Sequence, residues 1–308
     1  MSSAAPLLLS PKEVNLLQQS PTPISILDAT WFMPNVARDA KDEFLSKRIP
    51  GAQFLDLDDV ASSHELGLKH MMPDQKTFSQ ACEKLGVTPS SHVVLYDTHG
   101  VFSSPRALFM FRSFGHQNSS VINGGLPRWV HEGLPIESNS PTMIPSSHYA
   151  PPHFDVRSIR DYQQIVENSS LDPQTNPDAE IVLDARAHGR YLGTVPEPRP
   201  GLSSGHIPNS FSLPFNLFLQ KQGTPDGEYT TFLPEQELRA ALDNVAGVQY
   251  AEKIISGERP VVTSCGSGMT AGVLWLGLSL LGAKNIGLYD ESWTGYAMRP
   301  SSKIVKTE

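Results

Sequence analysis

The chain has 308 residues, 39% of them hydrophobic and 18% charged, which is typical of a folded globular protein and excludes a disordered or fibrous one. At about 100 to 200 residues per domain, this length favours two domains. The 24 Lys and Arg residues against 32 Asp and Glu residues give a net charge of −8. No general attraction to nucleic acid or to anionic lipid is therefore expected.

Only two cysteines, Cys82 and Cys265, occur in the sequence, which excludes a disulfide scaffold and a cysteine-rich zinc or iron–sulfur centre. No run approaches the roughly 18 apolar residues of a transmembrane helix. The short apolar run at residues 4–9 lacks the basic flank of a targeting signal. We expect a cytosolic protein without membrane association, metal or other cofactor, and leave a mitochondrial pool open.

A weak repeat runs along the chain, and its first copy begins with a helix near residue 11. Ser10 is placed to cap this helix, Pro11 takes its first position, and Glu13 completes a capping box. A buried strand is predicted at residues 24–28. The first copy then continues with predicted strands at residues 53–57, 93–96 and 120–123 and a helix at residues 107–114.

The second copy repeats this order of elements. It contains a predicted helix at residues 158–166, strands at 181–184, 261–264 and 286–289, and a helix at 271–281. Aspartate ends the first predicted strand of both copies, at Asp28 and Asp184. The Pro- and Ser-rich residues 137–153 indicate a linker, so we predict two domains, residues 1–150 and 151–308. Strands alternating with helices predict α/β domains with parallel sheets, which bind ligands at the carboxyl ends of strands.

Cys265 lies at such a strand end, since residues 265–271 read Cys-Gly-Ser-Gly-Met-Thr-Ala between a predicted strand and an apolar helix. The two glycines allow a tight loop around the sulfur, where free amides and the helix N-terminus stabilise an anion. A buried packing cysteine is the alternative, but this position favours a nucleophilic thiolate. Cys82 lies in a predicted amphipathic helix and is assigned to packing. A cysteine phosphatase is disfavoured because Ala271 stands where its Cys-x5-Arg loop needs arginine.

The whole pattern resembles the 3-mercaptopyruvate sulfurtransferases. The resemblance rests on the two halves, on the Cys265 loop and on further motifs at residues 184–191, 196–199, 204–208 and 289–293. It implies two tandem rhodanese-like domains, each with a parallel sheet flanked by helices. It also implies that Cys265 takes sulfur from 3-mercaptopyruvate, that pyruvate leaves, and that the Cys265 persulfide passes its outer sulfur to cyanide or to a thiol acceptor such as thioredoxin.

The resemblance also assigns the site residues. Arg190 and Arg199 match substrate-binding arginines, although surface ion pairing is the alternative for such residues. The other substrate-binding positions lie in the cysteine loop and are Gly266, Gly268, Met269 and Thr270. A proton relay of Ser267, His70 and Asp58 would span both domains. The relay is one of two readings, because Ser267 could instead cap the helix and the loop between Asp58 and His70 is one residue longer than usual.

Two positions depart from the family pattern. Met269 replaces a usual valine and Glu291 a common glycine, and we expect both at the pocket wall. Asp97 stands in the first half where the second has Cys265. Since a carboxylate cannot form a persulfide, the first half is predicted to be an inactive copy, with a longer loop at residues 97–106.

Two other functions stay open. A thiosulfate sulfurtransferase would use the same cysteine, but it typically has basic residues in the loop where Gly266 and Ser267 are neutral. A persulfide carrier in a sulfur relay, such as the one that serves tRNA thiolation, would receive sulfur from a desulfurase and act through protein partners. A carrier would release no pyruvate from 3-mercaptopyruvate.

Overall fold

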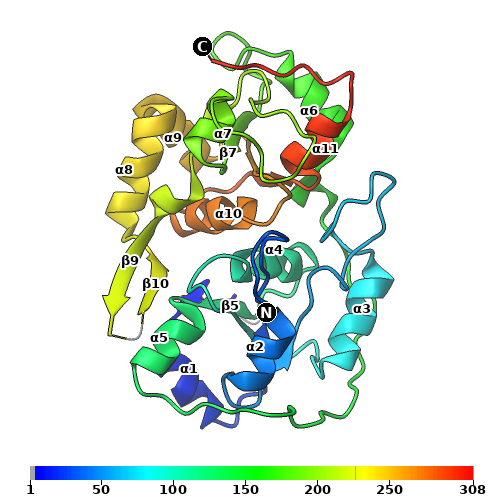
Figure 1. The fold of residues 1–308 in the computed structure, drawn as a ribbon, viewed down its shortest axis with the longest axis vertical. Helices are drawn as coiled ribbons and strands as arrows, with labels where there is room; N and C mark the ends of the chain where they lie inside the picture. The colour runs from blue at the N-terminus through cyan, green and yellow to red at the C-terminus, as the bar shows by residue number, and fades with distance from the viewer. Residues whose placement is uncertain (1–3, 226, 308) are drawn as a thin grey trace. The chain divides into compact units, whose positions relative to one another are not determined.

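The computed structural model describes residues 4–225 and 227–307, which form two compact units (Figure 1). The first unit contains residues 4–62, 72–155 and 219–232, and the second contains residues 63–71, 156–218 and 233–307. The predicted boundary near residue 150 separates the two sequence copies, whereas the compact units exchange two segments. Residues 63–71 belong to the second unit, and residues 219–232 belong to the first.

A five-stranded parallel sheet in the order β1-β5-β4-β2-β3 forms the centre of the first unit. Its elements are β1 (Leu8–Leu9), α1 (Pro11–Gln18), β2 (Ile24–Asp28), α2 (Ala40–Ser46), β3 (Gln53–Phe54), α3 (Gln75–Lys84), β4 (His92–Tyr96), α4 (Ser104–Ser113), β5 (Ser119–Ile122) and α5 (Gly125–His131). The antiparallel hairpin of β9 (Leu219–Thr224) and β10 (Gly227–Phe232) completes the unit.

The second unit repeats this topology, with a parallel sheet in the order β6-β12-β11-β7-β8. Its elements are η1 (Val156–Ser158), β6 (Ile159–Arg160), α6 (Tyr162–Ser169), β7 (Ile181–Asp184), α7 (His188–Leu192), β8 (Phe211–Ser212), η2 (Phe215–Phe218), α8 (Glu235–Ala246), α9 (Val248–Ser256), β11 (Val261–Ser264), α10 (Ala271–Leu280), β12 (Ile286–Tyr289) and α11 (Ser292–Met298). The predicted α/β class with a parallel sheet in each half is confirmed.

The central strands β4 and β11 are buried along their whole length. Strands that are covered on both faces become continuous apolar runs, which is why the sequence marks them clearly. The capping box predicted at Ser10 is present, with the Ser10 hydroxyl accepting from the Glu13 amide and Glu13 accepting from the Ser10 amide. Because the strands of each sheet run parallel, their carboxyl ends and the loops that follow them lie at the same edge of that sheet.

Several predicted boundaries were wrong. Residues 158–166 are not one helix, because the two-residue edge strand β6 precedes α6. β3 ends at Phe54 rather than at residue 57, and α4 begins at Ser104 rather than at residue 107. Proline is favoured in the first turn of a helix, so Pro105 lies inside α4 and the Asp97 loop is shorter than expected.

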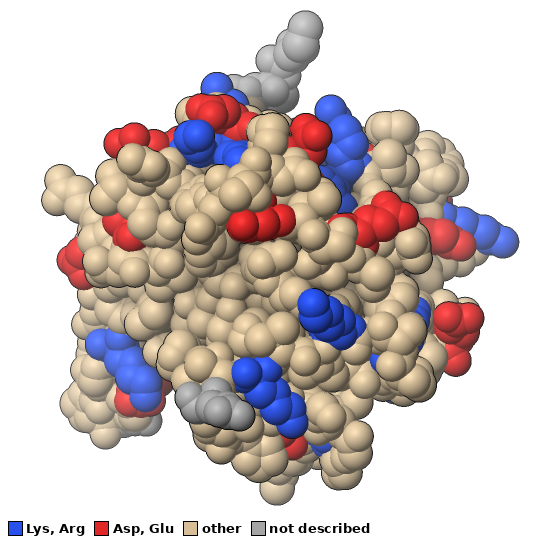
Figure 2. Space-filling model, turned by 90° about the horizontal axis from the view of Figure 1, so that it is seen from above, with Lys and Arg blue, Asp and Glu red and all other residues tan. Residues whose placement is uncertain are grey.

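Charged side chains of both signs are interspersed on the face shown in Figure 2. None of the helices in the described part of the chain is long and apolar enough to cross a membrane.

Candidate active site

Cys265 directly follows β11 and begins the loop that leads into α10. The residue is 2% exposed, and Gly268 adopts a positive φ of 84° that favours glycine. α10 begins at Ala271, and the side chain of its N-cap residue, Thr270, makes no capping hydrogen bond. The sulfur therefore lies between the carboxyl end of the central strand and the N-terminus of an apolar helix, as the sequence predicted.

The start of α11 holds the Cys265 loop in place. The Cys265 amide donates to Ser292 Oγ at 3.1 Å, and the Trp293 amide donates to the Cys265 carbonyl at 2.9 Å. Thr294 donates to the Gly266 carbonyl through its amide at 2.9 Å and through its hydroxyl at 2.6 Å. Ser292 and Trp293 belong to the motif at residues 289–293, but no local pattern indicated their contacts with the cysteine loop. Its role is to fix the backbone around the thiol.

Four amides of the loop have no partner within residues 4–225 and 227–307. The N–H groups of Gly266, Ser267, Gly268 and Met269 donate to no acceptor in this part of the chain. Successive free amides at a helix N-terminus form a site for an anion. The loop can therefore stabilise negative charge next to the Cys265 sulfur.

Arg190 and Arg199 both reach this loop. Arg190 belongs to α7 and Arg199 to the connection between α7 and β8. A Cβ added at Gly266 would lie 3.2 Å from Arg190 Nη2 and 3.4 Å from Arg199 Nη1. Glycine at this position leaves room for both guanidinium groups beside the loop. Two of the predicted substrate-binding residues are thus brought to the predicted nucleophile.

A buried chain of ion pairs connects to Arg190. Glu197 accepts from Arg186 Nη1 at 2.8 Å and from Arg190 Nε at 3.1 Å. Arg186 also pairs with Asp184 at 2.6 Å, and its guanidinium lies 4.1 Å from the centroid of the Trp293 ring. Burial disfavours the Arg186 cation, but Asp184 and Glu197 outweigh this effect and raise its pKa. Arg186 is therefore structural, whereas Arg190 extends from the chain toward the cysteine loop.

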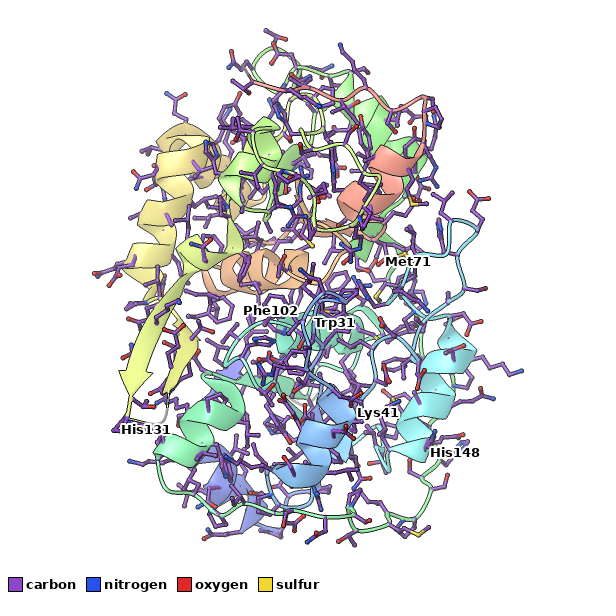
Figure 3. The ribbon with its side chains drawn as sticks, viewed as in Figure 1. Trp31, Lys41, Met71, Phe102, His131 and His148 are labelled. Atoms are coloured by element: carbon purple, nitrogen blue, oxygen red, sulfur yellow. The ribbon has the colours of Figure 1, made fainter. Side chains whose placement is uncertain are left out.

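The three predicted relay residues are divided between the two units. Ser267 is buried in the cysteine loop, and His70 is buried in the second unit with a positive φ of 47°. Asp58 belongs to the first unit, where its carboxylate accepts from Trp31 Nε1 at 3.3 Å. Trp31 in turn stacks on Phe102, and both residues are labelled in Figure 3. The N-cap residue of α10 is Thr270, and its side chain makes no capping hydrogen bond; both interpretations of Ser267 stay predictions.

The segment that carries His70 is attached to α11 and its flanks. His64 lies 3.7 Å from Glu291, and Glu65 lies 3.7 Å from Arg299. Glu291 also pairs closely with Arg299. Both ion-pair partners of Glu291, His64 and Arg299, lie outside the cysteine loop, and its place at the pocket wall stays a prediction. Met269 is 2% exposed within the loop.

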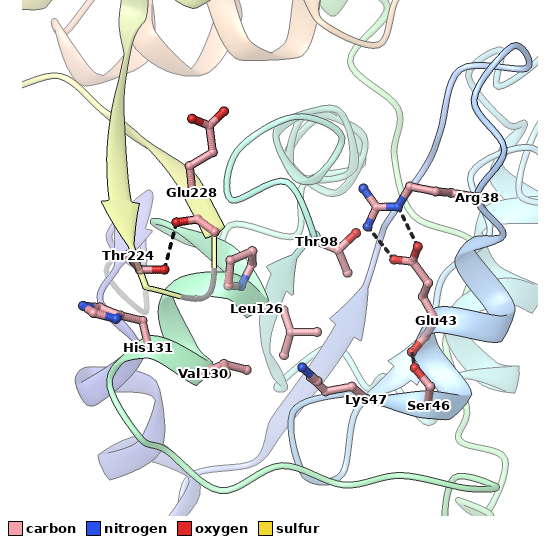
Figure 4. Close-up of a pocket in the computed structure, with 12 residues that line it drawn as sticks. Arg38, Glu43, Ser46, Lys47, Thr98, Leu126, Val130, His131, Thr224 and Glu228 are labelled. Carbon is pink, nitrogen blue, oxygen red and sulfur yellow. Dashed lines mark hydrogen bonds and ion pairs between the residues drawn. The ribbon is translucent and has the colours of Figure 1, made fainter.

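The Asp97 loop of the first unit occupies the equivalent position after β4. Beside it lies a cavity of about 450 Å³, whose lining includes Arg38, Lys47 and Thr98 (Figure 4). Arg38 and Lys47 come from the connection between β2 and β3, the counterpart of the connection that carries Arg190 and Arg199. Both Nε and Nη2 of Arg38 donate to Glu43, at 2.6 and 2.7 Å. The first unit thus keeps a cavity there, but its arginine is already paired.

Cys82 lies in α3 and is 1% exposed. Burial raises the pKa of its thiol well above the ordinary value, so the thiol form predominates. The assignment of Cys82 to packing agrees with this position.

Comparisons with known proteins place the chain in a family. The model of the Rhodanese-like domain matches residues 10–132 and 147–299. The chain is 37% identical to the 3-mercaptopyruvate sulfurtransferase of Mus musculus, with 94% of this chain and 90% of that protein covered. It is 34% identical to the thiosulfate/3-mercaptopyruvate sulfurtransferase 1, mitochondrial, of Arabidopsis thaliana, with 92% and 74% covered. The crystal structure of the Tum1 protein from Saccharomyces cerevisiae matches with a TM-score of 0.83 at 29% identity, covering 98% of each chain. The chain therefore belongs to the rhodanese family, as a sulfurtransferase with two rhodanese-like domains in tandem.

Proposed function

We propose that this sulfurtransferase takes its sulfur from 3-mercaptopyruvate and carries it as a persulfide on Cys265. The proposal rests on one observation: the guanidinium groups of Arg190 and Arg199 lie beside the loop that carries the Cys265 thiol. Their Nη2 and Nη1 atoms lie against Gly266, the residue next to Cys265. Two guanidinium groups suit a substrate that has a carboxylate and an adjacent carbonyl oxygen. Each charge-assisted hydrogen bond contributes about 1.5 to 3 kcal/mol.

In the first step, the Cys265 thiolate attacks the sulfur of bound 3-mercaptopyruvate. A sulfur–sulfur bond forms and the carbon–sulfur bond breaks, and its electron pair goes to the carbon of a pyruvate enolate. The proton of the substrate thiol ends on that carbon, so pyruvate leaves and Cys265 keeps a persulfide anion. Arg190 and Arg199 stabilise the enolate charge, and the free amides of residues 266–269 stabilise the persulfide.

In the second step, a nucleophilic acceptor, either a thiolate or cyanide, attacks the outer sulfur of the persulfide. The sulfur moves to the acceptor, and the Cys265 thiolate is restored. The acceptors proposed here are cyanide in the test tube, a thiol protein such as thioredoxin, and proteins of a sulfur relay. The Arabidopsis relative has a mitochondrial name, and we propose a cytosolic protein with a mitochondrial pool as the arrangement to be checked by cell fractionation.

For proton transfer to the enolate we propose Ser267, and His70 and Asp58 are proposed as further members of the relay. Ser267 is buried in the loop that receives the substrate, and His70 is a buried residue of the same unit. A positioned acid of this kind contributes typically a hundredfold to ten-thousandfold in rate. Gly266, Gly268, Met269 and Thr270 supply the backbone that surrounds the donor.

Thiosulfate is the second candidate donor, because one relative carries both donors in its name. The cysteine loop has no basic side chain at residues 266–271, which favours the keto acid over the dianion. A persulfide carrier without donor turnover is the third reading.

Donor turnover tests the proposal. We expect faster cyanide-dependent turnover with 3-mercaptopyruvate than with thiosulfate, release of pyruvate, and a mass increase of about 32 Da on Cys265. Cys265→Ser should lower kcat/KM by about a thousandfold or more, whereas Cys82→Ala should retain activity. Faster turnover with thiosulfate, a persulfide without pyruvate release, or full activity of Cys265→Ser would each overturn the proposal.

A further inference from the structure

Glu197 lies between the buried ion pairs of the second unit and the cysteine loop. Its side chain is 1% exposed, and its carboxylate is shared by Arg186 and Arg190. Nε and Nη2 of Arg190 both donate to it. Arg190 is 19% exposed at its side chain, and Nη2 is the same atom that lies against Gly266. The position of this guanidinium over the loop is therefore fixed by Glu197.

Glu197 also determines the charge that the loop experiences. Asp184, Arg186, Glu197 and Arg190 form one continuous chain of ion pairs, and their two negative and two positive charges add to zero. Without the carboxylate of Glu197, the same chain would carry one additional positive charge. Electrostatic interactions are strong at such a buried position because the surrounding dielectric response is weak.

We propose that Glu197 determines donor specificity: its carboxylate positions Arg190 at the Cys265 loop and cancels one positive charge there, so that a singly charged keto-acid thiol is preferred over a doubly charged sulfur donor. The inference rests on the proposed function, because it assumes that the donor binds against Arg190 and Arg199. 3-Mercaptopyruvate carries one negative charge, and thiosulfate carries two. An additional positive charge in the site favours the dianion more than the monoanion.

Two variants separate charge from position. Glu197→Gln removes the charge and keeps one side-chain oxygen that can accept from the two arginines, whereas Glu197→Asp keeps the charge but shortens the side chain. Glu180→Gln is the matched control. Glu180 pairs with Arg160 in the same unit, and it precedes β7 at the end of the strand away from the cysteine loop.

The measurement is kcat and KM for 3-mercaptopyruvate and for thiosulfate, with cyanide as the acceptor, at one fixed ionic strength. Glu197→Gln should raise the ratio of kcat/KM for thiosulfate to kcat/KM for 3-mercaptopyruvate by about tenfold, as expected for one added charge near the donor. Glu197→Asp should keep this ratio within about twofold of the original protein while raising KM for 3-mercaptopyruvate. Glu180→Gln should leave both donors unchanged.

A purely structural Glu197 would give another result. Both donors would then lose kcat/KM by the same factor in Glu197→Gln, and the unchanged ratio would overturn the inference. If Glu197→Gln does not fold, Glu197→Asp decides, because a shift of its ratio toward thiosulfate would contradict a role for the charge. Failure of the proposed function is a separate outcome, since it would be seen in the unsubstituted protein as faster thiosulfate turnover or as absence of pyruvate release.

Discussion

The loops that follow β4 and β11 occupy the same position in two copies of one fold, but their anion sites differ. In the first unit, the carboxylate of Asp97 accepts hydrogen bonds from four amides and one hydroxyl of its own loop. These donors are the amides of His99, Phe102, Ser103 and Ser104 and the Ser104 hydroxyl, at 2.7 to 3.1 Å. In the second unit, Cys265 replaces the carboxylate, and the amides of residues 266–269 have no acceptor in the described part of the chain.

The backbone that supports the two loops is repeated down to single hydrogen bonds. Leu126 donates to the Asp97 carbonyl at 3.1 Å, as Trp293 donates to the Cys265 carbonyl at 2.9 Å. The preceding residues, Gly125 and Ser292, both have a positive φ. A Cβ at Gly125 would overlap the Asp97 carbonyl oxygen, whereas Ser292 has a side chain that accepts from the Cys265 amide.

The comparison shows that the backbone frame of the site is shared by both copies, whereas the groups needed for sulfur transfer are present only in the second. The frame of strand, loop and helix offers amide donors to an anion in both copies. Only in the second copy is the anion site left open beside a nucleophile and two arginines. We therefore expect that a carboxylate in the second loop would occupy the site, and that loss of supporting contacts in the first loop would affect stability without affecting sulfur transfer.

The largest predicted effect is that of Cys265→Asp. The variant removes the nucleophile, so sulfur transfer should fall by about a thousandfold or more. The new carboxylate should accept from the open amides, as Asp97 does in the first unit, and make the variant more stable than Cys265→Ser by about 2 kcal/mol. Activity is measured by pyruvate release, and stability by thermal unfolding followed by circular dichroism.

Cys265→Ser is the control because it removes the same thiol without adding a charge. A Cys265→Asp variant that melts below Cys265→Ser would contradict the view that the two loops form equivalent anion sites.

A second difference between the copies lies at the ends of β2 and β7. Asp184 pairs with Arg186, whereas Asp28 has Thr30 at the equivalent position and accepts from its amide at 2.9 Å. Burial raises the pKa of Asp28 to about 7. The folded protein thus binds this proton more tightly than the unfolded chain, so the contribution of Asp28 to stability is largest at low pH and is lost as the pH rises toward 7.

Asp28→Asn should reduce the pH dependence of the free energy of unfolding. Between pH 5 and pH 7, the stability difference between the variant and the unsubstituted protein should change by about 2 kcal/mol in favour of the variant. Urea unfolding at several pH values from 5 to 8 measures it. Asp74→Asn is the control, since hydrogen bonds from Thr77 lower the pKa of Asp74 and its effect should be constant over this range. If the stability of Asp28→Asn had the same pH dependence as that of the unsubstituted protein, Asp28 would not titrate in this pH range.

Much of the fold followed from the sequence because buried parallel strands are continuous apolar runs. β2, β7, β11 and β12 have the predicted bounds. The edge strand β6 and the hairpin were missed for a physical reason. β6 has two residues, and β9 is polar and only partly buried, so neither carries a clear hydrophobic pattern.

The nucleophile of the site could be predicted from the sequence, but the residues that position it and its arginines could not. The strand, glycines and helix around Cys265 are local in sequence, and so their arrangement could be inferred. Glu197 was visible only as part of a motif, because its role depends on Arg186 and Arg190 meeting it in space. The contribution of Ser292 depends likewise on a contact across 27 residues of sequence, which no local pattern indicates.

The smallest predicted effect concerns the hairpin, which comes from the second half of the sequence but supports the loop of the first unit. Thr230 Oγ1 accepts from the Val101 amide at 3.0 Å and donates to the His99 carbonyl at 3.3 Å. The backbone of Thr230 also lies so close to Gly100 that a Cβ there would overlap it. The Asp97 loop is thereby held from outside by one threonine, as the Cys265 loop is held by α11.

Thr230→Val should remove both side-chain hydrogen bonds at nearly constant shape and destabilise the Asp97 loop by about 1 kcal/mol. In native-state hydrogen exchange, amides of residues 101–104 should then exchange about fivefold faster, while residues 265–270 and the rate of sulfur transfer should not change. Thr230→Ser retains the hydroxyl and should retain the protection. Equal exchange in the valine variant and the unsubstituted protein, or equally fast exchange in the serine variant, would mean that other contacts hold the loop. Faster hydrogen exchange confined to the Asp97 loop would instead establish that this loop depends on the β9–β10 hairpin, which comes from the second half of the sequence. The Cys265 loop, in contrast, would depend only on residues of the second unit.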